Sequence, residues 1–425
     1  MSTEAATTTE VVARECEYRV EVPPQTEVGI KLKSGSAELF GVELAIDREY
    51  VFRDRKLAIF TWYGCTLEVR GALEEAYTSE ETPMDSYLNI HAQLQRRREL
   101  AKAKHAAGPR VLVCGPVDSG KSTLTQILVN YALRLGEKPT LVELDVGQGC
   151  LSVPGTISAS PLDMNSLSIE EDFILTNPLA YFYGHAASSE NVELFRYQQQ
   201  VLSKAVKRRL ANDEEVNASG CVINTCGWVD GTGFDMLVHA IKDFDVDLVL
   251  VIGQDRLYSR LQSALTGANA NGADRSIVKL SRSGGVHSRV LLRRPRADCA
   301  IPTLSPCINE LSFDDVSFFA IKDMKVSDVM LPVGQVETQT DRLRVVPVEK
   351  TAELGHSLAA VAHPRHGQES SSSSTDLSWL LGASAAGFVF IKEVRVSEQK
   401  LVLLVPSPGP LPSRNLLVGS IKWME

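Results

Sequence analysis

Several features are missing from this 425-residue sequence, and each absence argues against a class of protein. None of the eight cysteines forms a C-x-x-C pair, and Cys114 ends an apolar run, so we expect reduced core cysteines and no disulfide framework or zinc site. No apolar run approaches the roughly 18 residues that a membrane-spanning helix needs. Residues 1–10 lack the basic and apolar regions of a signal peptide. We therefore expect neither a membrane span nor a signal peptide.

Positive charge is also in deficit, because 44 Lys and Arg face 53 Asp and Glu, for a formal net charge of −9. A protein that holds long duplexes by neutralising phosphates is usually basic. Any nucleic-acid contact should therefore be a short basic pocket. The apolar fraction of 44% and the charged fraction of 23% are typical of soluble globular proteins. At this length, two or three domains are expected.

The pattern of apolar and polar residues changes along the chain and predicts three domains after a disordered tail at residues 1–14. Residues 15–105 show short alternating strands and then a charged helix, which predicts an all-β, sandwich-like domain with a linker helix. Residues 106–306 alternate apolar strands with helices, which predicts an α/β domain with a parallel sheet. Strand patterns return in 307–425, a smaller mixed α/β domain that carries a disordered serine-rich insert at 366–376.

A phosphate-binding loop opens the central domain. The pattern G-x-x-x-x-G-K-[ST] is matched by Gly115-Pro116-Val117-Asp118-Ser119-Gly120-Lys121-Ser122, followed by Thr123. In such a loop, main-chain N–H groups surround the β-phosphate, the lysine reaches the β and γ oxygens, and the hydroxyl binds Mg²⁺. An apolar strand precedes the loop and a helix follows it, so the helix N-terminus faces the phosphates. The sequence thus predicts that ATP or a related triphosphate binds here with Mg²⁺.

Polar and aromatic residues follow the next two strands. Asp145, with Gln148 just beyond it, ends a strand where ligands of parallel sheets bind. Asp145 could hold the magnesium or take a proton from an attacking hydroxyl, although an aspartate there can also simply cap a turn. Gln148 is a candidate for orienting water or phosphate. Trp228 offers a plane for a base or sugar, with plain packing as the alternative.

A basic stretch lies after the fourth strand, at residues 282–294, and contains the pair Gly284-Gly285. Arginines on such a segment could close over the triphosphate and neutralise the charge that develops on a transferred phosphoryl group. A solvated basic loop is the alternative. The arginines concerned are Arg282, Arg289, Arg293 and Arg294.

With these motifs the chain resembles the Clp family of polynucleotide 5′-hydroxyl kinases almost from end to end. The resemblance rests on the phosphate loop together with Glu143-Leu144-Asp145-Val146-Gly147-Gln148 and Asn224-Thr225-Cys226-Gly227-Trp228. Further matching segments are 37–44, 60–62, 152–156, 283–286 and 408–412. The resemblance implies a P-loop kinase core between an N-terminal β domain and a small C-terminal α/β domain.

The resemblance also implies roles for particular residues. The phosphate loop, with Gly115, Asp118, Ser119, Gly120 and Thr123, would bind ATP, and Lys121 would act on its phosphates. Asp145 would be the base that acts on the RNA 5′-hydroxyl, and it would share Mg²⁺ with Ser122. Trp228 would hold the terminal nucleotide, Arg289 and Arg294 (or Arg293) would be lid arginines, and Glu17 and Lys56 match positions that help to hold the adenine.

The sequence departs from the family pattern in three places. The usual Gly-His-Thr-Ser-Pro turn reads Gly184-His185-Ala186-Ala187-Ser188, Arg282 replaces a lysine, and residues 297–306 replace an aromatic Tyr-Phe-Tyr-Gly element. The leading hypothesis is an active RNA 5′-hydroxyl kinase. A catalytically inactive, ATP-bound scaffold subunit of the mRNA cleavage factor is the alternative. A GTPase is less expected, because the guanine motif Asn-Lys-x-Asp is missing, and a metabolite kinase is less expected, because flanking β domains are an uncommon addition to one.

The resemblance finally implies partners and a place in the cell. Family members work with a cleavage-factor scaffold protein or with subunits of the tRNA-splicing endonuclease, so we expect partners of this kind beside the RNA 5′-hydroxyl end. Nuclear residence follows from the resemblance only. Whether RNA or DNA is preferred is left open.

Overall fold

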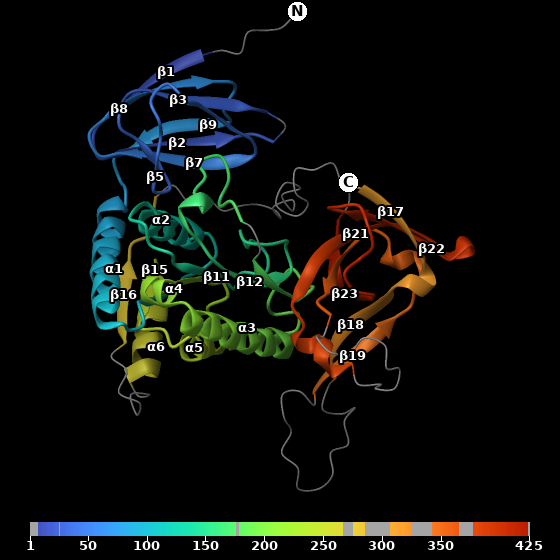
Figure 1. Ribbon diagram of the computed structural model, residues 1–425. Coiled ribbons are helices and arrows are strands. Elements are labelled where there is room, and N and C mark those ends of the chain that lie inside the picture. The colour runs from blue at the N-terminus through green and yellow to red at the C-terminus, as the bar shows by residue number, and fades with distance from the viewer. Residues whose placement is uncertain are drawn as a thin grey trace, which may run out of the picture.

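The computed structural model describes residues 7–24, 26–175, 178–266, 275–284, 307–324, 342–364 and 377–423. These residues form three domains in chain order (Figure 1). The N-terminal β domain lies above the central α/β domain in this view, and the C-terminal sheet lies beside it. The predicted class, an α/β P-loop domain between two flanking domains, is confirmed.

The N-terminal domain is a sandwich of two antiparallel sheets. One sheet has the order β1-β8-β3-β6, and the other has the order β5-β4-β7-β2-β9. The strands are β1 (Thr7–Val12), β2 (Cys16–Val22), β3 (Val28–Gly35), β4 (Glu38–Leu39), β5 (Val42–Glu43), β6 (Glu49–Phe52), β7 (Arg55–Thr61), β8 (Cys65–Arg70) and β9 (Glu75–Ser79). Alternating inward side chains such as Val28, Ile30 and Leu32 fill the space between the sheets.

The prediction of a disordered tail through residue 14 is wrong for strand β1. Thr7–Val12 pairs antiparallel with β8, from Thr7 opposite Arg70 to Val12 opposite Cys65. Only Val12 of this strand is buried in the sandwich core. The polar Thr/Glu composition misled the prediction, because an edge strand takes its stability from main-chain pairing and needs few apolar residues.

The central domain is a seven-stranded sheet with the order β13-β12-β11-β14-β10-β15-β16. Its strands are β10 (Arg110–Cys114), β11 (Thr140–Glu143), β12 (Thr156–Pro161), β13 (Leu179–Phe182), β14 (Cys221–Asn224), β15 (Leu248–Ile252) and β16 (Ser276–Leu280). Five neighbouring strands, β11, β14, β10, β15 and β16, are parallel, as predicted. Strands β12 and β13 add an antiparallel edge. The phosphate loop follows β10, which is the middle one of the five parallel strands.

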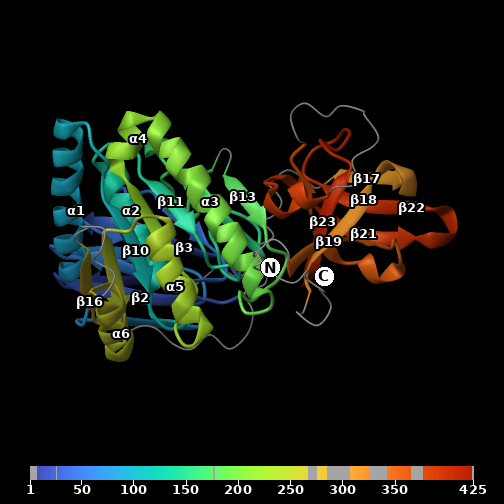
Figure 2. The same ribbon diagram turned by 90° about the horizontal axis from the view of Figure 1, so that it is seen from below.

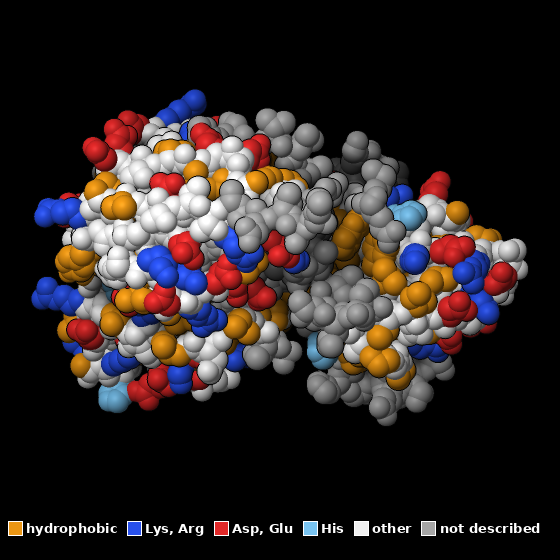
Figure 3. All heavy atoms as spheres, turned by 90° about the horizontal axis from the view of Figure 1, so that it is seen from above, with side chains coloured by type: hydrophobic (Ala, Val, Ile, Leu, Met, Phe, Trp, Pro, Cys, Tyr) orange, Lys and Arg blue, Asp and Glu red, His pale blue; other side chains and the backbone are white. Residues whose placement is uncertain are grey.

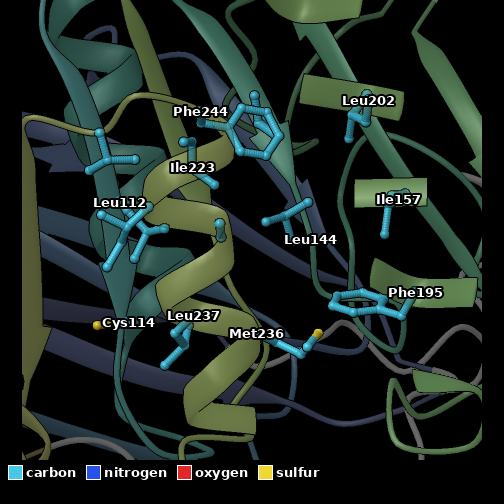
Figure 4. Close-up of a cluster of buried hydrophobic side chains, with 14 of the residues drawn as sticks. Leu112, Cys114, Leu144, Ile157, Phe195, Leu202, Ile223, Met236, Leu237 and Phe244 are labelled. Carbon is cyan, nitrogen blue, oxygen red and sulfur yellow. The ribbon is translucent and has the colours of Figure 1, made fainter. Parts of the chain in front are cut away.

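Helices cover both faces of this sheet (Figure 2). They are α1 (Met84–Lys104), α2 (Lys121–Arg134), α3 (Val192–Asn212), α4 (Glu214–Ser219), α5 (Thr232–Asp243) and α6 (Asp255–Thr266), with the short 3-10 helix η1 (Met164–Ser166) after β12. Side chains from α1 and α2 share one hydrophobic cluster with the sheet, and those from α3, α5 and α6 share another. Figure 4 shows part of the second cluster, where Leu112 and Ile223 of the sheet meet Phe244 and Leu237.

Truncation of this core should destabilise the protein strongly. Leu112 on the central strand is fully buried, so Leu112→Ala leaves a cavity and should lower the free energy of unfolding by about 3–5 kcal/mol. Leu100→Ala is the matched control, because Leu100 on α1 is 50% exposed and its loss should change stability by less than about 0.5 kcal/mol. Denaturant unfolding of the two variants measures the difference, and equal effects would contradict this assignment of the core.

The C-terminal domain is a second seven-stranded sheet, with the order β17-β22-β21-β20-β23-β18-β19. Its strands are β17 (Cys307–Ser312), β18 (Ser317–Asp323), β19 (Leu343–Val348), β20 (Ser357–Ala362), β21 (Ala385–Arg395), β22 (Lys400–Val405) and β23 (Asn415–Lys422). Within the described ranges its helical part consists of the 3-10 helices η3 (Phe313–Asp315), η5 (Ala352–Leu354), η6 (Ser378–Gly382) and η7 (Val396–Glu398). The predicted insert at 366–376 lies outside the described residues.

Three expectations from composition can be set beside this fold. In the described part of the chain, Cys16, Cys65, Cys114 and Cys221 are buried, and these four carry free thiols, as do Cys150 and Cys226. Cys299 lies outside the described residues. Across the same part of the chain, no helix is both long and apolar enough to cross a membrane. On the face shown in Figure 3, basic and acidic side chains are interspersed and do not separate by sign.

Candidate nucleotide and phosphoryl-transfer site

The phosphate loop, residues 115–122, turns sharply between β10 and α2. Asp118 and Gly120 both have left-handed backbone conformations, with φ of 53° and 91°. A Cβ atom at Gly120 would meet nothing within 4 Å, so this position favours glycine for its backbone conformation. At Gly115 the reason is packing, because a Cβ atom there would lie 2.8 Å from the carbonyl oxygen of Ile252. The loop therefore has the curled form that a phosphate-binding loop needs.

Lys121 is held inside this curl. Its side chain is buried, and Nζ donates a hydrogen bond of 2.8 Å to the carbonyl oxygen of Pro116. Burial lowers the pKa of the Lys121 ammonium, and the Asp145 carboxylate opposes that change. The buried Ser119 hydroxyl has no hydrogen-bond partner among the described residues. A phosphate group would supply the missing acceptor and would compensate the ammonium charge.

A polar cluster joins the ends of the neighbouring parallel strands β11 and β14, where Glu143 lies opposite Asn224. The Asn224 amide Nδ2 donates to both Glu143 oxygens, at 2.9 and 3.1 Å, and lies 3.3 Å from the Ser122 hydroxyl. The main-chain N–H of Asp145 donates to Glu143 Oε1 at 3.1 Å. Glu143 and Asn224 thus tie the strand end that carries Asp145 to the first turn of α2.

Asp145 both caps a turn and faces the cavity above the phosphate loop. Its Oδ1 accepts main-chain N–H groups from Gly147 at 3.0 Å and Gln148 at 3.2 Å. The same side chain lies among the residues that line the cavity, as does Gln148. Turn capping and a role at the site were alternatives in the sequence, and the geometry is compatible with both. The capping bonds fix the orientation of the Asp145 carboxylate.

Titration of Glu143 should make the stability of the ligand-free protein depend on pH. Burial raises the pKa of this carboxyl from 4.5 to about 8, and the Asp145 carboxylate adds to the increase. Between these two values the folded state keeps a proton that the unfolded chain releases. Stability is therefore greatest below the lower value and falls as the pH rises toward the upper one, on the order of 1 kcal/mol per pH unit.

Denaturant unfolding of wild type and Glu143→Gln from pH 5 to 9 tests this expectation. The variant keeps an uncharged side chain of the same shape, so the slope of stability against pH should become shallower. Glu99→Gln is the control, because Glu99 is exposed on α1 and should leave the slope unchanged. Parallel pH profiles for wild type and Glu143→Gln would contradict the assignment.

The β domain supplies another wall of the site. Glu17 is buried on β2, where Arg19 Nε donates to its Oε2 at 2.8 Å and the Thr82 hydroxyl donates to its Oε1. Lys56 on β7 forms an ion pair of 2.6 Å with Glu21. Each of these acids therefore has a cation beside it, and both Glu17 and Lys56 line the cavity.

The start of the basic stretch is attached to both domains. Arg282 Nη2 donates to the carbonyl oxygen of Asp118 in the phosphate loop at 2.7 Å. From the β domain, Arg19 Nη2 lies 3.3 Å from the Ser283 hydroxyl. The arginines predicted to close over the triphosphate, Arg289, Arg293 and Arg294, lie outside the described residues.

Trp228 is half-buried after β14 and forms part of the cavity wall. It packs closely on α5, because a Cβ atom at Gly233 would lie 2.6 Å from Trp228 Cγ. A Cβ atom at Gly227 would likewise lie 2.4 Å from the Val117 side chain of the phosphate loop. Both glycines permit this close approach. The indole is therefore held against the domain and still borders the cavity.

A single cavity of about 670 Å³ brings these groups together. It extends from the β domain over the phosphate loop to the residues that follow β13 and β14. Of the residues predicted from the sequence, its lining includes Glu17, Lys56, Asp118, Ser119, Gly120, Lys121, Ser122, Thr123, Asp145, Gln148 and Trp228. Gly115 is not part of this lining and contributes by its close packing against Ile252.

Glu143, Asn224 and Arg19 belong to this site although their sequence pattern predicted no role for them. A signal for Glu143 existed, because it lies two residues before Asp145 at the carboxyl end of a parallel strand, where ligands of such sheets bind. For Asn224 the signal was its place at the end of a predicted parallel strand. Nothing in the sequence marked Arg19, whose partner Ser283 is 264 residues away.

The parallel sheet, the curled loop after its central strand and the buried lysine define a P-loop nucleotide-binding protein. Models of three families cover the chain. They are the N-terminal beta-sandwich domain of polyadenylation factor at residues 11–101, the mRNA cleavage and polyadenylation factor CLP1 P-loop at 115–298, and the pre-mRNA cleavage complex II protein Clp1 at 304–425. The chain belongs to the Clp1 family.

Similar proteins agree with this assignment. The Protein CLP1 homolog of Arabidopsis thaliana is 40% identical over 97% of this chain and 93% of its own length. The human Polyribonucleotide 5′-hydroxyl-kinase Clp1 is 37% identical over 97% of this chain and 95% of its own. A solved complex of Clp1p with Pcf11p matches the fold with a TM-score of 0.81 at 24% identity, over the whole of both chains.

Proposed function

We propose that this protein is an ATP-dependent polynucleotide 5′-hydroxyl kinase that acts on RNA ends. The observation that carries the proposal is the cavity that holds Lys121, Asp145 and Trp228 together. An ammonium group for the phosphates, a carboxylate for the acceptor hydroxyl and an aromatic plane for a nucleotide are the groups that this reaction needs. Several relatives named Polyribonucleotide 5′-hydroxyl-kinase Clp1 support the choice of substrate.

ATP would lie with its phosphates in the loop and its adenine toward the β domain. Main-chain N–H groups at the start of α2 and the Lys121 ammonium would bind the phosphate oxygens. Glu17 and Lys56 line the wall on the β-domain side. The carboxylate and ammonium of these two residues are compatible with hydrogen bonds to the edge of a purine.

Magnesium fits the oxygen donors at the head of α2. The Ser122 hydroxyl and the Asp145 carboxylate both border the cavity, and Mg²⁺ prefers a few such oxygens together with phosphates and water. When bound, the ion neutralises charge on the β and γ phosphates. Asn224 beside Ser122 would orient that hydroxyl.

The chemistry of the residues then follows from their positions. Asp145 would align the 5′-hydroxyl and accept its proton as the oxygen attacks the γ-phosphorus. The bond from that phosphorus to the β–γ bridging oxygen breaks, and ADP leaves. Lys121 would stabilise the charge on the phosphate oxygens, and Trp228 would hold the terminal nucleotide. Arg289 and Arg294 (or Arg293) are proposed to complete the neutralisation from the lid.

A transfer assay tests the proposal. Purified protein, radiolabelled ATP and Mg²⁺ are combined with a 5′-hydroxyl RNA oligonucleotide, and a DNA oligonucleotide of the same sequence runs in parallel. Labelled RNA is the expected product, and an oligonucleotide that already carries a 5′-phosphate is the matched negative control. Absence of labelled product from both 5′-hydroxyl substrates at every metal concentration would overturn the kinase assignment.

One observation favours a second function, that of an ATP-bound scaffold subunit of the mRNA cleavage factor. Ala186 borders the cavity where the family pattern has a threonine, so a hydroxyl that could contact RNA phosphate is missing. Two solved structures of a relative pair Clp1p with Pcf11p, and one of them concerns ATP loss in a point mutant. The scaffold function predicts stoichiometric ATP in the purified protein and no turnover.

Under either function we propose nuclear residence and a partner from the cleavage factor or the tRNA-splicing endonuclease. Immunofluorescence of the tagged protein and mass spectrometry of its purified complexes test these two points. A wholly cytoplasmic signal, or complexes with no RNA-processing subunit, would contradict them.

A further inference from the structure

Strand β23 of the C-terminal domain is in direct contact with the turn that follows β13. The main-chain N–H of Ser420 donates to the carbonyl oxygen of Gly184 at 2.8 Å. A Cβ atom at Gly419 would lie only 1.9 Å from that oxygen. Ile421, which follows Ser420, packs against Gly155, where a Cβ atom would lie 2.1 Å from Ile421 Cδ1. Glycines on both sides therefore let the two main chains touch, beside the β12–β13 edge of the central sheet (Figure 1).

Side chains reinforce the contact through Glu190. The Ser420 hydroxyl donates to Glu190 Oε2 at 3.1 Å and lies 2.9 Å from His185 Nδ1. Because the serine proton is already used, the His185 ring donates through Nδ1 in this arrangement. The other carboxylate oxygen of Glu190 accepts the main-chain N–H of Ala187 at 3.1 Å. One carboxylate thus links the turn to the C-terminal domain.

The other end of this turn forms part of the cavity wall. Ala186, Ala187, Ser188 and Ser189 line the cavity, together with Gly147, Cys226 and Trp228. The Ser188 hydroxyl lies 3.5 Å from Cys226 Sγ, and a Cβ atom at Gly147 would lie 3.1 Å from the Ala186 carbonyl oxygen. The turn therefore packs against the segments that carry Asp145 and Trp228, which the proposed function assigns to the acceptor.

We propose that the C-terminal domain positions the acceptor-binding wall of the site, with Gly419 and Ser420 as its positioning residues. They fix residues 184–189, so that the wall meets the 5′-terminal nucleotide of a polynucleotide. The inference rests on the proposed function and names the part of the protein that shapes its acceptor subsite. ATP binding, which depends on the phosphate loop and the β domain, is independent of this contact.

Two variants test the inference. Ser420→Ala removes the bonds to His185 and Glu190 and keeps the main-chain bond to Gly184, so it should raise KM for the 5′-hydroxyl RNA about 3- to 10-fold. Gly419→Ala pushes β23 away from the turn at Gly184 and should raise that KM further. In both, the Kd for ATP from calorimetry should stay within about twofold of wild type. Ser420→Thr restores a hydroxyl and should recover most of the lost affinity.

Glu193→Gln is the matched control, because Glu193 on α3 pairs with Arg342 of the C-terminal domain at 3.3 Å and lies outside the cavity wall. It weakens the same domain contact, so it should lower Tm as Ser420→Ala does and leave KM unchanged.

Each outcome decides a different point. An unchanged KM in Ser420→Ala, or an equal rise in Glu193→Gln, would overturn the positioning role and leave the kinase assignment intact. Fluorescence anisotropy with labelled 5′-hydroxyl RNA, in the presence of ATP, reports acceptor binding without turnover. If wild type neither binds that RNA nor transfers phosphate, the proposed function and this inference both fail.

Discussion

Replacement of Lys121 by alanine should abolish phosphoryl transfer. The ammonium group is buried within the phosphate loop and bonded to the Pro116 carbonyl oxygen, and the proposed function assigns it to the charge that develops during transfer. Loss of one such preorganised donor costs about 10²- to 10³-fold in kcat, and loss of a full charge should cost at least as much. ATP affinity should fall as well, because the same group binds the phosphates in the ground state.

Lys138→Ala provides the control for this experiment. Lys138 lies just beyond α2 and forms an ion pair with Glu215 at the surface, so its loss should change neither kcat nor stability appreciably. Single-turnover transfer to a 5′-hydroxyl RNA measures the rate, and circular dichroism confirms that both variants are folded. A Lys121→Ala protein that transfers phosphate at the wild-type rate would rule out catalysis at this loop.

Asp145→Asn should lower transfer by about 10²- to 10⁴-fold while sparing ATP binding. The amide is nearly isosteric, and its oxygen can still accept the N–H groups of Gly147 and Gln148, so the turn should persist. What the variant loses is the negative charge and the capacity to accept a proton. The predicted signature is thus a fall in kcat with a nearly constant Kd for ATP.

Asp245→Asn is the matched control, since Asp245 pairs with Arg110 and Lys207 at the surface and should leave the rate unchanged. If Asp145→Asn keeps the wild-type rate, the proton must go elsewhere, and the buried Glu143 beside it is the next carboxylate to replace. Loss of ATP binding in Asp145→Asn would instead show that its main contribution is to the metal and nucleotide.

The phosphate loop and the elements around it could be predicted from the sequence alone. The loop was predictable because its information is local: an apolar strand, glycines at turn positions, a lysine and a helix lie within some 25 residues. The apolar strand before the loop and the helix after it, both expected from the sequence, correspond to β10 (Arg110–Cys114) and α2 (Lys121–Arg134). Alternation of strands and helices likewise gave the parallel sheet, since side-chain periodicity reports which faces are buried.

The surroundings of the loop depend instead on how distant segments pack together. Strand β1 pairs with a strand more than 50 residues away, Arg19 reaches Ser283, and β23 touches the turn at Gly184. None of these contacts leaves a local pattern, because each depends on how whole domains pack. The state of Glu143 was likewise out of reach, since the pKa of a carboxyl is set by its burial and its neighbours in space. The phosphate loop can be predicted because its residues are consecutive in the sequence, whereas the cavity walls bring together residues that only folding makes neighbours.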